Sequence, residues 1–417
     1  MNRTAVLCSG QGAQYTTMGK KLYEENAKAR EIFDQADKVL GFELSALCFE
    51  GEEAELTLTA NAQPAILTLS YAHASAYFDD LSIYPVAYAG HSLGEYTALV
   101  CAGAMEFTDA VKIVRLRGEL MQRAATAPSG MAAVLGGSIG RVAAACEAAS
   151  TPQEIVVISN ENASNQTVIS GHEAAIGRAA ATLEAEGCRI NHLTVSAPFH
   201  SPYMHAAADE LRSELEKYTY QDPAVPVIAN ATARPYRGKE SIVSNLTNQL
   251  AARVRWTATM DYLTSLRINS TVEVGPKQVL SNLMRSEKPT ITAFSLDSEQ
   301  DIDRWREFIR PKATDTTLLG RCLAVAVATR NTNFDSEQYR IGVVEPYESI
   351  RQLQEKVEGE ERLPSDEEMT EALISLKKIL ETKGTDAAEQ RARFEQIMKE
   401  TATFNRLRDN ARELRLI

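Results

Sequence analysis

The sequence YPVAYAGHSLGEYTALV at residues 84–100 decides the fold of the surrounding chain. Residues 84–89 are an apolar run of strand length, and apolar residues return at helical spacing after Gly94. Between them, Gly90-His91-Ser92-Leu93-Gly94 fits the pattern G-x-S-x-G, whose two glycines permit a sharp turn from strand to helix. The pentapeptide alone also fits an ordinary glycine turn, but the flanking strand and helix favour an exposed nucleophile. The segment therefore predicts α/β structure and a reactive hydroxyl on Ser92.

The chain on both sides of this segment repeats the alternation of strands and helices, which predicts a largely parallel sheet. A strand at residues 5–8 ends in a glycine turn, a helix follows at 110–121, and further strands are expected at 224–229, 270–274 and 290–294. Between these parts the order changes to β-α-β-β-α-β, the ferredoxin-like signature, with strands at 131–135, 154–158, 166–169 and 189–195 and helices at 139–149 and 173–186. We expect a small α+β subdomain at 128–195, inserted into a discontinuous core of residues 1–127 and 196–305.

Residues 311–417 have a different character and predict a C-terminal helical extension. Ser365 and Glu368 have the spacing of a capping box, and an apolar stripe follows at Met369, Leu373, Leu376 and Leu380. A second helix is expected from Asp386, with its own apolar positions continuing to Phe404. This pattern predicts a helical hairpin that buries its stripe against the core or a partner.

Composition excludes several classes of protein. The 417 residues include 44 Lys and Arg and 56 Asp and Glu, a net charge of −12 that disfavours a nucleic-acid binder. The six cysteines are scattered, without C-x-x-C or histidines at ligand spacing, which predicts reduced thiols and no metal site. No signal-peptide core or run of about 18 apolar residues is visible, so we expect a cytoplasmic protein without a membrane span.

A nucleophilic serine needs a base, and six histidines are candidates. His200 follows the last strand of the predicted subdomain, in the loop that returns the chain to the core. His205 lies five residues further, and position alone separates the two only weakly. His91 adjoins Ser92, so its side chain should point away and support the turn.

Eight sequence blocks resemble malonyl-CoA:acyl carrier protein transacylases in order and spacing. They cover about residues 1 to 300 and read Gly10-Gln11-Gly12-Ala13-Gln14, Gln63-Pro64-Ala65, Gly90-His91-Ser92-Leu93-Gly94-Glu95, Arg115-Leu116-Arg117-Gly118, Asn160-Glu161-Asn162-Ala163, Phe199-His200-Ser201, Gln249-Leu250 and Glu273-Val274-Gly275-Pro276. The resemblance implies an α/β-hydrolase-like parallel-sheet core carrying the inserted ferredoxin-like subdomain. The length and charged tail further resemble the stand-alone acyltransferases of hybrid lipopeptide-polyketide synthetases of the iturin group.

The resemblance also implies a reaction. Malonyl would pass from malonyl-CoA to the phosphopantetheine thiol of an acyl carrier protein, or of a carrier domain in a synthetase, for fatty-acid or polyketide chain extension. Ser92 would carry the malonyl ester, His200 would act as base and then acid, and the backbone carbonyl of Gln249 would orient His200. The backbone N–H groups of Gln11 and Leu93 would form the oxyanion hole. No bound cofactor or metal is implied.

Five further residues are implied to bind substrate. Arg117 would bind the free carboxylate of malonyl. A hydrolase of stalled acyl chains would have no use for this arginine. The bulk of Phe199 would favour malonyl over methylmalonyl. The remaining three are Gln63, Asn162 and Met121.

Two other functions stay open on the sequence: an acyl-thioester hydrolase on the same fold, and a docking protein that acts through its tail.

Cys8-Ser9 stands where the family usually has Phe-Pro, which predicts a looser loop around Gln11. Because carrier proteins are acidic, we also expect a positive rim, with Lys277, Arg285 and Lys288 as candidates by position.

Overall fold

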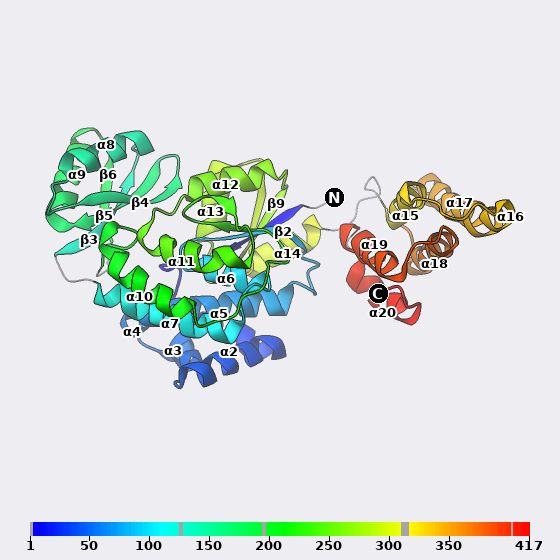
Figure 1. The fold of residues 1–417 in the computed structure, drawn as a ribbon, viewed down its shortest axis with the longest axis horizontal. Helices are drawn as coiled ribbons and strands as arrows, with labels where there is room; N and C mark the ends of the chain where they lie inside the picture. The colour runs from blue at the N-terminus through cyan, green and yellow to red at the C-terminus, as the bar shows by residue number, and fades with distance from the viewer. Residues whose placement is uncertain (1–2, 125–127, 194–196, 310–316, 402) are drawn as a thin grey trace. The chain divides into compact units, whose positions relative to one another are not determined.

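The computed structural model describes residues 3–124, 128–193, 197–309, 317–401 and 403–417 (Figure 1). Contacts between residues divide the chain into two compact units. The larger holds Arg3–Tyr77 and Pro85–Ile302, and the smaller holds Phe78–Tyr84 and Asp303–Ile417.

A six-stranded sheet forms the centre of the larger unit, and its inner strands are parallel. In spatial order it contains β10 (Thr292–Ser295), β9 (Ser270–Val274), β1 (Thr4–Cys8), β2 (Pro85–Gly90), β7 (Val227–Ala229) and the short antiparallel β8 (Arg234–Pro235). Cys8 pairs with both Gly90 and Val274 in this register. The turns that follow β1, β2 and β9 therefore meet at one edge of the sheet, where parallel folds place their ligand sites.

Helices cover both faces of this sheet. On one face, α12 (Trp256–Ser265) and α13 (Val279–Glu287) bury their apolar sides against Ala5, Leu7 and Ala87 (Figure 1). On the other face, α5 (Thr59–Tyr77) and α6 (Gly94–Cys101) contact the strands. Besides the two helices of the second sheet described below, this unit also contains α1 (Lys20–Glu25), α2 (Ala27–Leu40), α3 (Leu44–Glu50), α4 (Glu53–Thr57), α7 (Phe107–Arg123), α10 (His205–Leu215), α11 (Ile242–Ala251) and the start of α14 (Glu299–Phe308).

A second sheet of four antiparallel strands belongs to the same unit. Its spatial order is β4 (Val156–Ala163), β5 (Gln166–His172), β3 (Ser129–Leu135) and β6 (Arg189–His192), with α8 (Ile139–Ala149) and α9 (Glu173–Ala185) packed on it. The expected β-α-β-β-α-β order is present. Backbone hydrogen bonds from Val254 to Ser159 and from Glu161 to Val254, 2.8 and 2.9 Å long, join β4 to the loop before α12. This junction brings the small sheet to the functional edge of the large one.

The smaller unit contains more helices than the sequence predicted. They are α15 (Leu318–Ala328), α16 (Ser336–Tyr339), a π-helical turn at Arg340–Val344, α17 (Glu345–Gly359), α18 (Asp366–Thr382), α19 (Ala387–Glu400) and α20 (Phe404–Glu413). The capping box of Ser365 and Glu368 starts α18 as expected. The hairpin prediction was wrong in extent, because the α18 stripe packs into a core shared with Leu318, Ile350 and Phe394 of other helices in this unit. Phe404, which the sequence placed at the end of the second predicted helix, begins the separate helix α20.

The parallel-sheet core and the helical extension are confirmed, while the domain boundaries stay a prediction. The boundaries at 127/128 and 195/196, and the end of the strand predicted at 189–195, lie outside the described residues. Within the described ranges, no helix has both the length and the apolar content to cross a bilayer. No three His, Cys, Asp or Glu side chains in those ranges come together as a metal site.

Candidate active site

The turn between β2 and α6 presents Ser92 at the edge of the sheet. Ser92 has a φ of +51°, a strained left-handed conformation for a residue with a side chain. The flanking glycines are required by packing: a Cβ on Gly90 would lie 1.9 Å from the carbonyl of Gly94, and one on Gly94 would lie 2.1 Å from the oxygen of Cys8. The motif therefore forms the sharp turn that its sequence predicted.

Three residues from distant segments form a hydrogen-bonded chain at this turn. His200 Nε2 lies 2.7 Å from Ser92 Oγ, and His200 Nδ1 lies 2.9 Å from the backbone oxygen of Gln249. A carbonyl only accepts, so Nδ1 carries the proton and the free Nε2 accepts the Ser92 hydroxyl. His205, the alternative base, is exposed at the start of α10.

The surroundings of His200 keep its ring neutral. Its side chain is buried, and burial together with the nearby Arg117 cation lowers its pKa to about 3. The imidazole is therefore free to accept a proton at neutral pH.

Arg117 places a buried cation beside the Ser92 hydroxyl. It is 1% exposed, and its guanidinium donates to Ser92 Oγ at 3.1 Å, to Gln63 Oε1 at 2.8 Å and to Gln249 Oε1 at 3.1 Å. All three acceptors are neutral. Within the described ranges Arg117 forms no ion pair, and its Nε has no hydrogen-bond partner. A buried guanidinium in this state favours an anionic ligand.

Two unused backbone donors lie on turns that pack against each other. The N–H groups of Gln11 and Leu93 donate to no acceptor in the described part of the chain. A Cβ on Gly10 would lie 2.5 Å from the oxygen of His91, so the two turns are in direct contact. This arrangement is suited to hold a developing oxyanion.

The other predicted site residues also lie near this centre, where Gln63, Met121 and Phe199 are buried and Asn162 is half-buried. Gln63 Nε2 contacts Met121 Sδ at 3.4 Å, which connects both residues to Arg117. Asn162 Oδ1 lies 2.9 Å from Nε2 of His91, so His91 joins the turn to the small sheet. Phe199 is 6% exposed and directly precedes His200.

Comparisons with known proteins agree with this geometry. The model of the acyl transferase domain family matches residues 6–291. A malonyl CoA-acyl carrier protein transacylase of Bacillus subtilis is 35% identical over 395 residues, covering 94% of this chain and 99% of the relative. The chain belongs to the malonyl-CoA:acyl carrier protein transacylase family.

Other members of this transacylase family support the assignment. A second relative of that name from Bacillus subtilis strain 168 is 39% identical over 305 residues, covering 73% of this chain and 96% of the relative. Among solved structures, FabD from Acinetobacter baumannii has a TM-score of 0.71 at 37% identity, covering 74% of this chain and 98% of that one. A type II PKS acyl-carrier protein in complex with its malonyl-transacylase gives a TM-score of 0.71 at 34% identity, covering 73% and 99%. The 395-residue match also extends into the helical tail.

The sequence did not predict the buried polar residues that support the turn carrying Ser92. Asn230 accepts the Ser92 N–H at 2.6 Å and donates to the oxygen of Gly90 at 2.6 Å. The buried Glu95 carboxylate accepts from the N–H of Asn230, the side chain of Gln249 and the hydroxyl of Tyr236. Burial raises the pKa of Glu95 to about 7. One signal was available, because Asn230 directly follows a predicted strand at the functional edge.

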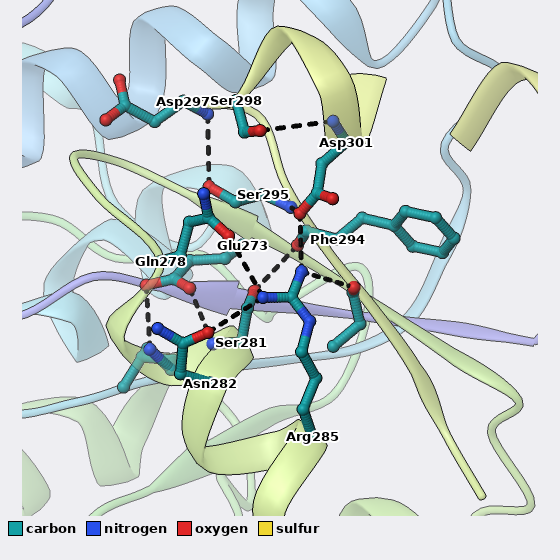
Figure 2. A network of polar contacts seen from close by, with 12 residues as sticks. Glu273, Gln278, Ser281, Asn282, Arg285, Phe294, Ser295, Asp297, Ser298 and Asp301 are labelled. Carbon is teal, nitrogen blue, oxygen red and sulfur yellow. Dashed lines mark hydrogen bonds and ion pairs between the residues drawn. The ribbon is translucent and has the colours of Figure 1, made fainter. Parts of the chain in front are cut away.

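The suggested positive rim stays a prediction, and the structure shows that two of its candidates, Arg285 and Lys288, already have acidic partners. Its side chain pairs with Asp301 at 2.6 Å and also donates to Gln278, Asn282 and the oxygen of Ala293 (Figure 2). These contacts tie α13 to β10 and to the start of α14. Lys288 pairs with Asp261. Arg285 therefore contributes to the packing of α13, although 32% of its side chain is exposed.

Proposed function

We propose that this protein transfers malonyl from malonyl-CoA to the phosphopantetheine thiol of an acyl carrier protein, through a malonyl ester on Ser92. The observation that carries this proposal is the buried Arg117, which contacts the Ser92 hydroxyl and has no carboxylate partner in the described ranges. A substrate with a free carboxylate completes that site, and malonyl supplies one.

The first half-reaction uses the chain of three hydrogen-bonded residues. The Ser92 oxygen attacks the thioester carbonyl while its proton passes to His200 Nε2. The backbone carbonyl of Gln249 steadies the imidazolium through Nδ1–H. The tetrahedral intermediate places its negative oxygen toward the Gln11 and Leu93 N–H groups. Breaking the C–S bond releases the CoA thiolate, which takes the proton back from His200.

The second half-reaction repeats these steps with a different thiol. His200 takes the proton of the carrier phosphopantetheine thiol, the thiolate attacks the ester, and the proton returns to Ser92. Gln63, Met121 and Asn162 border the acyl group in this proposal, and Phe199 limits the space at its α-carbon.

No bound cofactor takes part in the proposed reaction. The predicted cytoplasmic location and the predicted synthetase partner belong to the same proposal. So does the division into a core, an inserted subdomain and a tail.

The test is mass spectrometry of the intact protein after mixing with malonyl-CoA. The wild type should gain one malonyl group, and Ser92→Ala should gain none. His200→Ala should form the adduct at least 100-fold more slowly, while His205→Ala, the matched control, should resemble the wild type. An adduct on Ser92→Ala would refute the nucleophile.

The acceptor decides between transferase and hydrolase. Adding a phosphopantetheinylated carrier protein should move the malonyl group to the carrier. Release of free malonate without a loaded carrier would refute transfer in favour of hydrolysis.

A further inference from the structure

Ser9 lies at the end of β1, immediately before the turn that carries Gln11. Its side chain is fully buried, and its backbone N–H donates to the oxygen of Val274 at 3.1 Å. Its hydroxyl lies 3.1 Å from Glu273 Oε1, 3.1 Å from the oxygen of Val274 and 3.4 Å from that of Pro276. All three neighbours of this hydroxyl are oxygens that can accept, so Ser9 is a donor. Burial raises the pKa of Glu273 to about 7, so this carboxyl group carries only part of a negative charge at neutral pH.

The Glu273 carboxylate is itself fixed. It lies at the N-terminus of α13 and accepts the backbone N–H groups of Leu280 at 3.1 Å and Ser281 at 2.7 Å (Figure 2). The Ser281 hydroxyl donates to the oxygen of Phe294 at 2.9 Å and so attaches the same helix turn to β10. Two elements of regular structure, β9 and α13, therefore hold the acceptor that Ser9 reaches.

Ser9 is closely packed on two sides. A Cβ on Gly275 would lie 2.7 Å from Ser9 Oγ and 2.8 Å from its Cβ. On the opposite side, a Cβ on Gly94 would lie 2.9 Å from the oxygen of Ser9. Ser9 is therefore packed between the turn after β9 and the turn that bears Ser92.

We propose that the Ser9 hydroxyl is a positioning residue, whose bond to Glu273 fixes the turn of Gly10 and Gln11 so that the Gln11 and Leu93 N–H groups converge on one oxyanion. This inference rests on the proposed function. It also changes the expectation from the sequence, where serine in place of proline predicted a loose turn. A hydrogen bond to a fixed carboxylate supplies the restraint that a pyrrolidine ring would otherwise give.

The expected effect follows from the contact that is lost. In Ser9→Ala the turn loses its hydrogen bond to Glu273, so the rate constant for malonylation of Ser92 should fall by about three- to tenfold. Complete loss of an oxyanion donor would cost about 100- to 1,000-fold, which sets an upper limit. The KM for malonyl-CoA should stay within about twofold, because Ser9 touches no part of the site that binds the malonyl carboxylate.

The experiment is rapid-quench mass spectrometry of the full chain, in which the adduct amplitude reports the active fraction and the time course reports the rate constant. Ser270→Ala is the matched control, since it removes a buried hydroxyl at the other end of β9, where Ser270 contacts Thr4 at 2.9 Å and touches neither Ser9 nor Glu273. It should acylate at the wild-type rate even if its thermal midpoint falls. A purely structural role for Ser9 would lower the amplitude of Ser9→Ala and leave its rate constant unchanged.

The outcomes separate the two proposals. A wild-type rate constant in Ser9→Ala, or equal slowing in Ser270→Ala, overturns the positioning role while the malonyl adduct still supports the function. No adduct on the wild type overturns both. If Ser9→Ala does not fold, Ser9→Cys supplies a weaker donor of similar size and should acylate about threefold more slowly; a wild-type rate there overturns the inference.

Discussion

Arg117 should determine which acyl group the enzyme accepts. Its guanidinium is buried beside Ser92 and bonded only to neutral groups within the described ranges. Replacing it by methionine, which has similar length and no charge, removes the partner for the malonyl carboxylate. Replacing it by lysine keeps the charge but loses the planar fork that can make two parallel bonds.

The size of the effect follows from burial. Removing one partner of a buried, hydrogen-bonded charge pair costs about 2 to 5 kcal/mol. Arg117→Met should therefore lower kcat/KM for malonyl-CoA by about 30-fold to several thousand-fold. Acetyl-CoA has no carboxylate to lose, and its kcat/KM should stay the same or rise, because the variant no longer holds an unpaired cation beside the acyl group. The kcat/KM of Arg117→Lys for malonyl-CoA should lie between that of the wild type and that of Arg117→Met.

The assay is loading of a carrier protein from malonyl-CoA and acetyl-CoA, each measured alone and in competition by intact mass. Acetyl transfer reports whether the Ser92 and His200 machinery survives the substitution. Arg115→Met is the matched control, because Arg115 is two residues away, pairs with Glu119 at 2.7 Å and should leave selectivity unchanged. An equal fall for both substrates in Arg117→Met would refute the role in carboxylate recognition.

Three further predictions concern the same site. Because the pKa of His200 is about 3, the rate of malonyl-adduct formation should not halve near pH 6.5; a midpoint there in quench measurements from pH 5 to 8 would contradict the buried, neutral base. Phe199→Ala should raise the ratio of methylmalonyl to malonyl loading by about 10- to 200-fold, and an unchanged ratio in competition assays would remove Phe199 from extender selection. The pKa of Glu95 is raised from 4.5 to about 7, so the folded state holds a proton that the unfolded chain releases, and wild-type stability falls as pH rises from 4.5 through 7. Chemical unfolding should therefore show Glu95→Gln gaining up to about 3 kcal/mol on the wild type over that interval, and a pH-independent difference would count against it.

The sequence predicted the local structures well because each has a local cause. The strand, the two glycines and the following helix around Ser92 lie within 17 consecutive residues. The motif has glycine at both positions because a Cβ at either one would clash with the neighbouring backbone. Helix α8 at Ile139–Ala149 and strand β9 at Ser270–Val274 were also predicted at their observed bounds, since apolar periodicity marks both.

The supporting contacts were not predictable in the same way. Glu95 lies 135 residues from Asn230 and 154 from Gln249, and no spacing rule connects residues so far apart. The tail shows the same limit. The apolar stripe of α18 predicted a buried helix face, but only the structure shows that α15 and α17 cover this face.

By itself the sequence determined that a serine would stand on a sharp turn between strand and helix, because glycine content and apolar spacing act over a few residues. The family resemblance already indicated His200 as the base. The tertiary structure alone decided that Asn230 and Glu95 support the turn, and that Ser9 donates to Glu273. Those outcomes depend on the register that places β1 between β2 and β9. Hydrogen bonds reach only about 3 Å, so strand register and burial determine which distant side chains meet.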